Sequence, residues 1–330
     1  MTSATKPFAD LSPDCILDAL ESIGVHSDGR LLALNSYENR VYQIGIEQDS
    51  SLIAKFYRPA RWNDLAILEE HAFVQSLADA EIPVVAPLRF AGKSLQHFND
   101  YRFTLFAKHG GRAPELDQHG VLEWLGRFIG RIHAIGALND FSERPTLDIA
   151  SYGIEPSQYL LEQRFLPPEL SGVYHGVIQQ ALEGVQHCFD RAGDVNHIRL
   201  HGDCHTGNIL WTADGPHFVD FDDSRMGPAV QDLWMLLSGN PEEMSKQMSA
   251  ILSGYESFYE FDLRQMHLIE ALRTLRLIHY AAWIALRWAD PAFPQAFPWF
   301  NTQRYWQDRI LELREQIANM EESPLLLKNY

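Results

Sequence analysis

Residues 201–208 read HGDCHTGN, and residues 218–223 read FVDFDD. Asp203 and Asn208 are five positions apart, and Asp220 follows Asn208 by twelve positions at the end of a short apolar run. A carboxylate, an amide and a second carboxylate therefore occur in the order and spacing used by enzymes that transfer a phosphoryl group from a nucleotide. The two stretches predict a loop followed by a short strand that together carry the chemistry.

Each of these residue types suits one part of such a reaction. The carboxylate of Asp203 can orient an attacking hydroxyl and accept its proton. Mg²⁺ prefers hard oxygen ligands, so the amide oxygen of Asn208 and the carboxylate of Asp220 can hold the metal against nucleotide phosphates. We therefore predict Asp203 and Asp220 as catalytic residues, and Asn208 and Asp220 as metal ligands.

Two other interpretations of the first stretch stay open at this point. His201, Cys204 and His205 form a cluster of zinc-binding residue types, but their spacing matches no closed four-ligand pattern and no second Cys/His pair lies nearby. The stretch can also be a polar loop that joins two core strands.

The composition is that of a large folded protein. The chain has 330 residues, 46% of them hydrophobic and 12% aromatic, which is enough for two domains or one bilobed unit. Its net charge of −17 disfavours binding to nucleic acid. It has no long apolar run and no secretory signal, and its three cysteines are far apart. We expect a cytoplasmic protein with reduced thiols, no membrane span and a monomeric state.

Hydrophobic periodicity predicts an α+β chain with a β-rich N-terminal part and a mainly helical remainder. Ser12 and Pro13 open a helix that Gly24 ends, and a second helix is expected over Asp64–Ala80. The expected strands are 30–34, 41–46, 52–57, 84–90 and 101–106, followed by short ones at 198–200, 209–211 and 217–221. We place the boundary near residues 106–111, with lobes of 1–106 and 107–330.

The N-terminal part contains candidate nucleotide-binding residues. Lys55 lies on the third expected strand, and Glu69 and Glu70 lie on the following helix, with spacing that favours Glu70 as the partner of Lys55. The turn at 35–40 lacks glycine, but Ser36 can bind a phosphate and Asn39 can adopt a left-handed turn. A plain hairpin turn is equally consistent. Residues 103–108, which include Phe106, are the expected connection between the lobes, whose backbone can bind adenine.

The acidic run after the predicted strand calls for separate assignments. Alternate side chains of an extended segment share a face, so we expect Asp220 and Asp222 to point the same way and Asp223 to point away. Asp222 is then a group behind the first metal or a ligand of a second one. We expect Asp232 to start a buried helix and to fix the backbone of the catalytic loop.

With these residues the chain resembles the aminoglycoside phosphotransferase and choline kinase superfamily, which has a bilobed protein-kinase-like fold. The HGDxHxxN motif and the downstream Asp220 are shared across it, and stretches such as NSYENRVYQ (35–43), KFYRPARW (55–62) and RWADPAFPQAFPW (287–299) are similar to cytosolic bacterial Ser/Thr protein kinases of stress responses. The resemblance implies ATP and Mg²⁺ as ligands and a protein Ser/Thr hydroxyl as acceptor. It gives Asp203, Asn208, Asp220, Ser36 and Lys55 the roles described above.

Two departures from protein kinases leave the acceptor open. The Arg of the H-R-D motif is Gly202 here, and the interval from Asp223 to Gly227 is too short for an activation segment. The alternatives are a small-molecule kinase that acts on an amino alcohol, sugar or aminoglycoside, and a non-catalytic nucleotide-binding regulator. Trp283, Trp288, Trp299 and Trp306 can line an acceptor pocket, although helical spacing favours a core role.

Overall fold

The computed structural model describes residues 7–47 and 50–327. Contacts divide the chain into two compact units, which we describe separately. The first unit is Met1–Pro114, Phe141–Arg144 and Thr206–Ser224, and the second is Glu115–Asp140, Pro145–His205 and Arg225–Tyr330. The stretch 206–224, expected in the C-terminal lobe, thus packs with the N-terminal residues, and the division into lobes at residue 106 stays a prediction.

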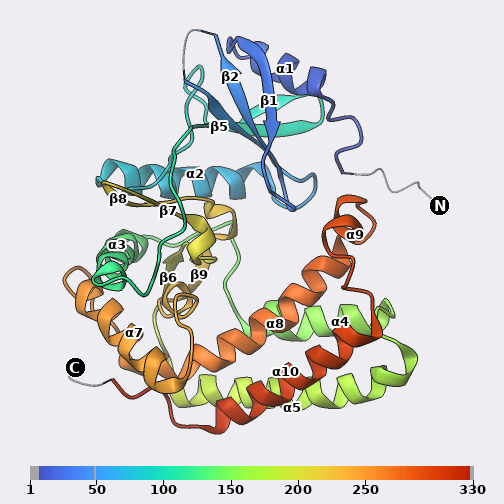
Figure 1. Cartoon of the computed structure of the whole chain (residues 1–330), viewed down its shortest axis with the longest axis vertical. Coiled ribbons are helices and arrows are strands. Elements are labelled where there is room, and N and C mark those ends of the chain that lie inside the picture. Colours follow the sequence, from blue (N-terminus) through green and yellow to red (C-terminus); the bar gives the residue numbers. More distant parts are fainter. Residues whose placement is uncertain (1–6, 48–49, 328–330) are drawn as a thin grey trace. The chain divides into compact units, whose positions relative to one another are not determined.

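The first unit is built on an antiparallel sheet in the order β1–β2–β3–β5–β4 (Figure 1). Its elements are α1 (Pro13–Glu21), β1 (Ser27–Ala33), β2 (Arg40–Ile46), β3 (Leu52–Phe56), α2 (Asp64–Asp79), β4 (Gln96–Phe98), β5 (Tyr101–Ala107), η2 (Thr206–Asn208), β7 (Ile209–Thr212), β8 (Gly215–Phe218) and η3 (Phe221–Asp223). Lys55 pairs with Val41 on one side and Thr104 on the other, so it lies on an interior strand.

The first helix forms as the sequence predicts. Ser12 caps it by accepting a hydrogen bond from the backbone N–H of Cys15 (3.1 Å), Pro13 is its first residue, and Gly24 has a φ of 79° just beyond its end. Its buried Ile16 and Leu20 belong to one hydrophobic core with the inner face of the sheet. The capping signal and the apolar stripe therefore agree with the packing.

The prediction of a strand at residues 84–90 is wrong. This stretch makes only isolated bridges, from Val84 to Phe218, from Pro87 to Phe106 and from Phe90 to Lys93. Pro83 and Pro87 have no backbone N–H to donate, so the stretch cannot sustain a ladder of hydrogen bonds. The sheet is completed instead by β4, whose three residues are too few to show an alternating pattern.

A buried polar chain lies behind the sheet. The hydroxyl of Tyr57 is 2.8 Å from Nε2 of His71, and Nδ1 of His71 is 2.9 Å from the hydroxyl of Ser94. Burial and the nearby charges of Lys55 and Arg144 lower the pKa of His71 to about 3. His71 is therefore neutral at ordinary pH, and each of its ring nitrogens has a hydroxyl partner.

The lowered pKa of His71 predicts how the free energy of unfolding depends on pH. The unfolded chain protonates His71 below about pH 6.5 whereas the folded chain does not, so the free energy of unfolding falls as the pH drops from about 6.5 toward 3. In urea titrations, the wild type should lose up to about 1.4 kcal/mol per pH unit more than His71→Gln in that range. Parallel pH profiles of the two proteins would contradict this expectation.

The second unit is mainly helical (Figure 1). Its elements are α3 (Val121–Gly136), η1 (Ala150–Ile154), α4 (Glu155–Glu162), α5 (Pro168–Ala192), β6 (His197–Leu200), β9 (Arg225–Pro228), α6 (Gln231–Trp234), α7 (Pro241–Tyr255), η4 (Leu263–Leu268), α8 (Ile269–Leu286), α9 (Ala292–Ala296) and α10 (Gln303–Glu321). Strands β6 and β9 pair antiparallel, and β9 was not foreseen because Gly227 and Pro228 are poor strand formers.

Aromatic side chains fill the core between α4, α5, α8, α9 and α10. Trp306 is fully buried and lies edge-on to Tyr174, with ring centroids 5.6 Å apart. Trp283 and Trp288 are partly buried against the same core, while Trp299 is exposed. The core interpretation of these tryptophans therefore holds for Trp306, Trp283 and Trp288.

Helices α3 and α7 pack closely through glycine (Figure 1). A Cβ atom on Gly126 would overlap the carbonyl oxygen of Ile251, and one on Gly254 would overlap the carbonyl oxygen of Glu123. Both partners are backbone atoms of a facing helix, which cannot move without shifting the helix. The absence of side chains therefore sets the distance between the two helices.

We expect Gly126→Ala to lower the free energy of unfolding by roughly 1–3 kcal/mol, because the added methyl forces the helices apart. Gly176→Ala on α5 is the matched control, since a Cβ there meets nothing within 4 Å. Alanine should stabilise that exposed helical position by about 0.5–1 kcal/mol. Urea unfolding of both variants checks the pair, and equal effects would contradict the proposed packing constraint.

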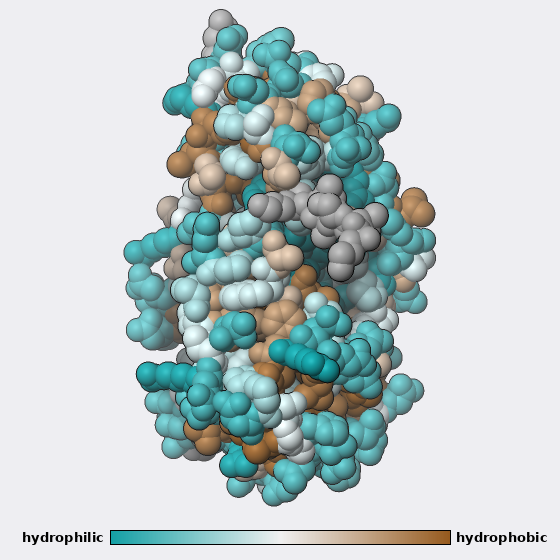
Figure 2. All heavy atoms as spheres, turned by 90° about the vertical axis from the view of Figure 1, so that its right-hand side faces the viewer, coloured by the Kyte–Doolittle hydropathy of each residue, from teal (hydrophilic) through white to brown (hydrophobic). Residues whose placement is uncertain are grey.

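The surface is mostly hydrophilic on the face that Figure 2 shows, where brown residues occur in small groups among teal and white ones. Exposed large apolar residues such as Leu32, Leu65 and Leu138 are spread over different elements. Within the described residues, no helix is both long enough and apolar enough to cross a membrane.

Candidate active site

The predicted residues are divided between the two units, and each group is described within its own unit. In the first unit, Lys55 is the centre of a buried ionic cluster. Its Nζ lies 2.9 Å from Oδ1 of Asp220, 3.1 Å from Oδ1 of Asp222 and 4.0 Å from Oε1 of Glu70. Burial alone would lower the pKa of Lys55, but the three carboxylates outweigh it and raise that pKa well above its usual value.

The two neighbouring glutamates of α2 have different partners. Oε2 of Glu70 accepts a hydrogen bond from Arg144 (2.9 Å), so this buried carboxylate lies between Arg144 and Lys55. Glu69 instead accepts hydrogen bonds from the backbone N–H groups of residues 142, 143 and 144 at 2.7–3.1 Å. The structure thus places Glu70 beside Lys55 and uses Glu69 to hold the segment that carries Arg144.

The extended geometry expected for residues 220–223 is wrong. Strand β8 ends at Phe218, Asp220 has a left-handed backbone (φ 60°, ψ 64°), and Phe221–Asp223 forms a 3₁₀ turn. Asp220 and Asp222 still both contact Lys55, but the left-handed residue produces this, not strand alternation. Aspartate tolerates the left-handed region better than most residues do.

The two aspartates differ sharply in exposure. The Asp220 side chain is 54% exposed, whereas that of Asp222 is 5% exposed and pairs with Arg61 as well as Lys55. Burial would raise the pKa of Asp222, but Arg61 and Lys55 outweigh it and lower that pKa. Asp222 is therefore a buried partner of two cations, while Asp220 reaches solvent.

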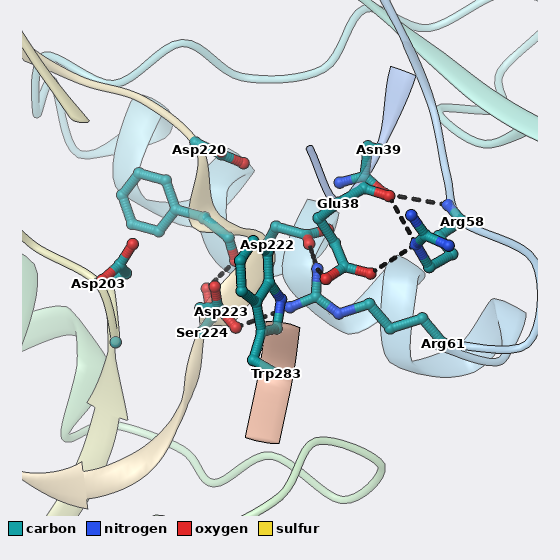
Figure 3. Close-up of polar contacts among 12 residues, drawn as sticks. Glu38, Asn39, Arg58, Arg61, Asp203, Asp220, Asp222, Asp223, Ser224 and Trp283 are labelled. Atoms are coloured by element: carbon teal, nitrogen blue, oxygen red, sulfur yellow. Dashed lines mark hydrogen bonds and ion pairs between the residues drawn. The ribbon is translucent and has the colours of Figure 1, made fainter. Parts of the chain in front are cut away.

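Arg58 and Arg61 contact residues of the turn between β1 and β2 (Figure 3). The Asn39 side chain is buried and accepts a hydrogen bond from the backbone N–H of Arg58 (3.0 Å). Arg58 Nε also lies 3.0 Å from Glu38, and Arg61 contacts Glu38, Asp222 and Asp223. The turn is thereby linked through charges to the acidic residues that follow β8.

Neither asparagine of this turn adopts the left-handed conformation open to it, because none of the residues 35–40 has a positive φ. The side-chain hydrogen bond of Asn39 holds the turn in place of that backbone geometry. Ser36 is half-buried in the same turn, between β1 and β2. Phe106 lies on β5 opposite Ile53 of β3, close to the end of the strand.

The hairpin of β7 and β8 brings the two predicted metal ligands next to each other. Ile209 pairs with Phe218, and the N–H of Val219 continues the register by donating to the carbonyl of Asn208 (3.0 Å). Asn208 thus lies opposite the residue before Asp220. These are an amide and a carboxylate with oxygen donors, and Mg²⁺ typically takes one or two protein ligands and completes its shell with phosphate and water oxygens. The pair fits Mg²⁺ on these grounds.

In the second unit, Asp203 lies in the loop after β6 with cationic neighbours. Its Oδ1 accepts a hydrogen bond from Arg276 of α8 (2.6 Å), and its Oδ2 lies 3.3 Å from Nε2 of His205. Burial disfavours its charged form, but His205 and Arg276 outweigh burial and hold the pKa of Asp203 well below its ordinary value. Asp203 is therefore ionised at neutral pH.

A buried carboxylate fixes the backbone of this loop, as expected for Asp232. Its oxygens accept the backbone N–H groups of His201 (2.8 Å) and Gly202 (2.9 Å), and His133 Nε2 lies 3.1 Å away. Gly202 has a φ of 85°, a conformation that glycine adopts without strain. The loop before Asp203 is thus held by hydrogen bonds that a side chain of α6 supplies.

Zinc fits this loop poorly. Cys204 is buried, and burial with the nearby charges of Asp232 and Asp203 raises the pKa of its thiol well above the usual value. A zinc ligand must be a thiolate, which this environment disfavours. Throughout residues 7–47 and 50–327, no three His, Cys, Asp or Glu side chains are grouped to hold a metal.

Comparison with known proteins agrees with this geometry. Residues 30–269 match the model of the phosphotransferase enzyme family. The chain belongs to this family. It is 43% identical over 327 residues to a protein of Escherichia coli named "Stress response kinase A", with 99% of each chain covered. It is also 43% identical over 320 residues to "Serine/threonine protein kinase RdoA" of Salmonella typhimurium, with 97% of each chain covered. The membership expected from the sequence is confirmed, and the chain is a phosphotransferase.

Solved structures share the fold of this family member at low identity. An amicoumacin kinase in complex with AMP-PNP, Ca²⁺ and its ligand has a TM-score of 0.72 and 20% identity, with 94% of each chain covered. A microcompartment-associated aminopropanol kinase has a TM-score of 0.70 and 15% identity, with 94% of this chain and 97% of that chain covered. The predicted α+β, kinase-like fold class is therefore confirmed.

Several charged residues around the predicted ones were not foreseen. Arg61 and Arg144 lie in the ionic cluster of this phosphotransferase, and Arg276 contacts Asp203. Arg61 and Asp222 are 161 positions apart, Arg144 and Glu70 are 74 apart, and Arg276 and Asp203 are 73 apart. No local pattern marks Arg144 or Arg276, and the sequence predicted only Glu70 as a partner of Lys55.

Asp232→Asn should loosen the loop, because the amide group replaces one acceptor oxygen by a donor that faces backbone N–H groups. We expect a loss of about 1–3 kcal/mol in the free energy of unfolding and a lower turnover. Asp262→Asn is the control, since Asp262 is an N-cap at which asparagine serves equally well. Urea unfolding and phosphoryl-transfer rates check both variants. Wild-type values for Asp232→Asn would show that the loop does not depend on this carboxylate.

Proposed function

We propose that this phosphotransferase uses ATP and Mg²⁺ to phosphorylate Ser or Thr hydroxyls of protein substrates in a bacterial stress response. The observation that carries the proposal is the full-length similarity to a stress response kinase and to a serine/threonine protein kinase. The chain acts as a cytoplasmic monomer in this proposal, and its free Cys15, Cys188 and Cys204 suit a reducing compartment.

The first unit supplies the nucleotide side of the reaction. Lys55 binds the ATP phosphates and Glu70 orients Lys55, while Ser36 contacts a phosphate from the turn that Asn39 holds. The backbone near Phe106 binds adenine. Asn208 and Asp220 hold Mg²⁺, which neutralises charge on the phosphate oxygens. The support is the 2.9–4.0 Å clustering of carboxylates around Lys55 and the exposure of Asp220.

Asp203 orients the acceptor hydroxyl and accepts its proton. The acceptor oxygen forms a bond with the γ-phosphorus while the bond from that phosphorus to the β,γ-bridging oxygen breaks and ADP leaves. The hydroxyl proton passes to the carboxylate of Asp203. A carboxylate with a low pKa is a weak base, so its larger contribution is to orient the hydroxyl, and transfer of the proton comes late.

The second candidate is a small-molecule kinase. It is favoured by the short interval between Asp223 and Gly227, and the solved structures that share the fold include an amicoumacin kinase and an aminopropanol kinase. Those neighbours are at most 20% identical, so they support the fold and not the acceptor. γ-labelled ATP offered with candidate proteins and with a panel of amino alcohols, sugars and aminoglycosides distinguishes the two functions. Label that enters only small molecules would overturn the protein-kinase proposal.

Two substitutions test the division of roles. Asp203→Asn should leave binding of ATP with Mg²⁺ nearly intact and lower turnover by roughly 10²–10⁴-fold, because it removes the carboxylate that orients the acceptor hydroxyl and accepts its proton. Asp220→Ala should instead weaken Mg²⁺-dependent nucleotide binding, because it removes a charged metal ligand. Calorimetric nucleotide titration with and without Mg²⁺, beside turnover measurements, gives both quantities. The assignment is wrong if Asp203→Asn abolishes nucleotide binding while Asp220→Ala leaves it unchanged.

A further inference from the structure

The second unit contains a cavity of about 300 Å³. It is lined by residues that include His205, Trp234, Met244, Arg273 and Arg276. Two of these, His205 and Arg276, are the residues that contact the carboxylate of Asp203. A group bound in the cavity therefore lies next to the residue that we propose to orient the acceptor hydroxyl.

The cavity contains cationic side chains, although the whole chain has a net charge of −17. Two arginines line it, and no carboxylate is among its described lining residues. Arg273 and Arg276 are three positions apart on α8, so their side chains lie on the same face of the helix. The cavity therefore offers guanidinium N–H donors to an anionic acceptor, whereas none of its described lining residues offers a carboxylate to a cationic one.

Both arginines have partners that orient them without covering them. Arg276 contacts Asp203 and remains 39% exposed. Arg273 pairs with Glu270 (3.2 Å) and lies over the ring of Trp234, with its guanidinium carbon 5.5 Å from the centroid. Contacts at their edges leave further N–H groups of each planar guanidinium for a bidentate carboxylate or phosphate.

We propose that Arg273 and Arg276 bind an anionic group of the phosphoryl acceptor, so that preferred protein substrates carry a carboxylate or phosphate close to the acceptor Ser or Thr. This inference rests on the proposed function. Three positions along a helix span about 4.5 Å, which an extended peptide covers in one or two residues. The anionic residue therefore lies within about two positions of the acceptor.

The test uses the full-length enzyme with ATP, Mg²⁺ and a matched peptide set. One Ser peptide is made with Asp, Asn, Lys or phosphoserine two positions from the acceptor, and a small hydroxycarboxylate is assayed beside it. The wild type should show a KM for the Asp or phosphoserine peptide about 10- to 100-fold below that for the Asn peptide, the range expected for a charged hydrogen bond. The two anionic peptides show whether carboxylate or phosphate is preferred.

Arg273 is the residue to vary, because it lies in the cavity but is not a described partner of Asp203. Arg273→Gln should raise the KM for the Asp peptide toward that of the Asn peptide, with the KM for ATP unchanged. Arg273→Glu should reverse the preference, so that the Lys peptide becomes the better substrate. This gain distinguishes a specificity residue from one that only supports folding. Arg314→Gln, an exposed residue of α10, is the matched control and should keep the wild-type pattern.

Failure of the inference and failure of the proposed function give different results. Equal KM values for the Asp and Asn peptides in the wild type would overturn the anion site and leave the protein kinase intact. Label that enters the hydroxycarboxylate but no peptide, in a manner that depends on Arg273, would overturn the protein kinase and support the anion site.

Discussion

The structure of the first unit depends on the burial of one ammonium group. Removing a charge from water costs several kcal/mol unless charged partners compensate for it, and Lys55 has three carboxylates around it. Two of those carboxylates are themselves buried, so their negative charges also need charged partners. Glu70 is compensated by Arg144, and Asp222 by Arg61. Every charged residue of this cluster therefore needs the others, except Asp220, whose exposure leaves it available to a ligand.

A second device recurs in both units, namely a carboxylate that accepts consecutive backbone N–H groups. Glu69 holds the amides of residues 142–144, and Asp232 holds those of residues 201 and 202. In each case the loop carries a functional neighbour, Arg144 in one and Asp203 in the other. Loops have few hydrogen bonds of their own, so a carboxylate that accepts their backbone N–H groups gives them a defined shape without requiring a longer helix or strand.

Sequence reasoning succeeded where the signal is local. The cap at Ser12, the helix over Asp64–Asp79 and the interior strand of Lys55 follow from patterns within a few residues. The fold class and the family followed from motifs. The adjacency of Asn208 and Asp220 was implied only by residue type and spacing, and the structure explains it by the hairpin register.

It failed where the backbone leaves its usual regions or where partners are distant. The alternation of side chains along a strand does not apply at Asp220, because its left-handed backbone changes the direction of the chain that follows it. Residues 84–90 are largely apolar but form no strand, because Pro83 and Pro87 have no backbone N–H to donate. Arg144 and Arg276 lie on segments with no motif, and their roles appear only when residues 74 and 73 positions away come into contact with them.

The distribution of the first unit along the chain has a consequence for synthesis in the cell. Lys55 and Asp220 are 165 positions apart, and residues up to Ser224 belong to the same unit. A ribosome that has released the whole sheet has therefore not yet made the aspartates that compensate its buried lysine. Lys55 and Asp220 are separated by about half of the chain, so the first unit can be completed only after residues 115–140 and 145–205 of the second unit have been synthesised. Translation speed and chaperones that shield the unfinished sheet should thus affect the yield of this protein more than that of one whose domains are continuous in sequence.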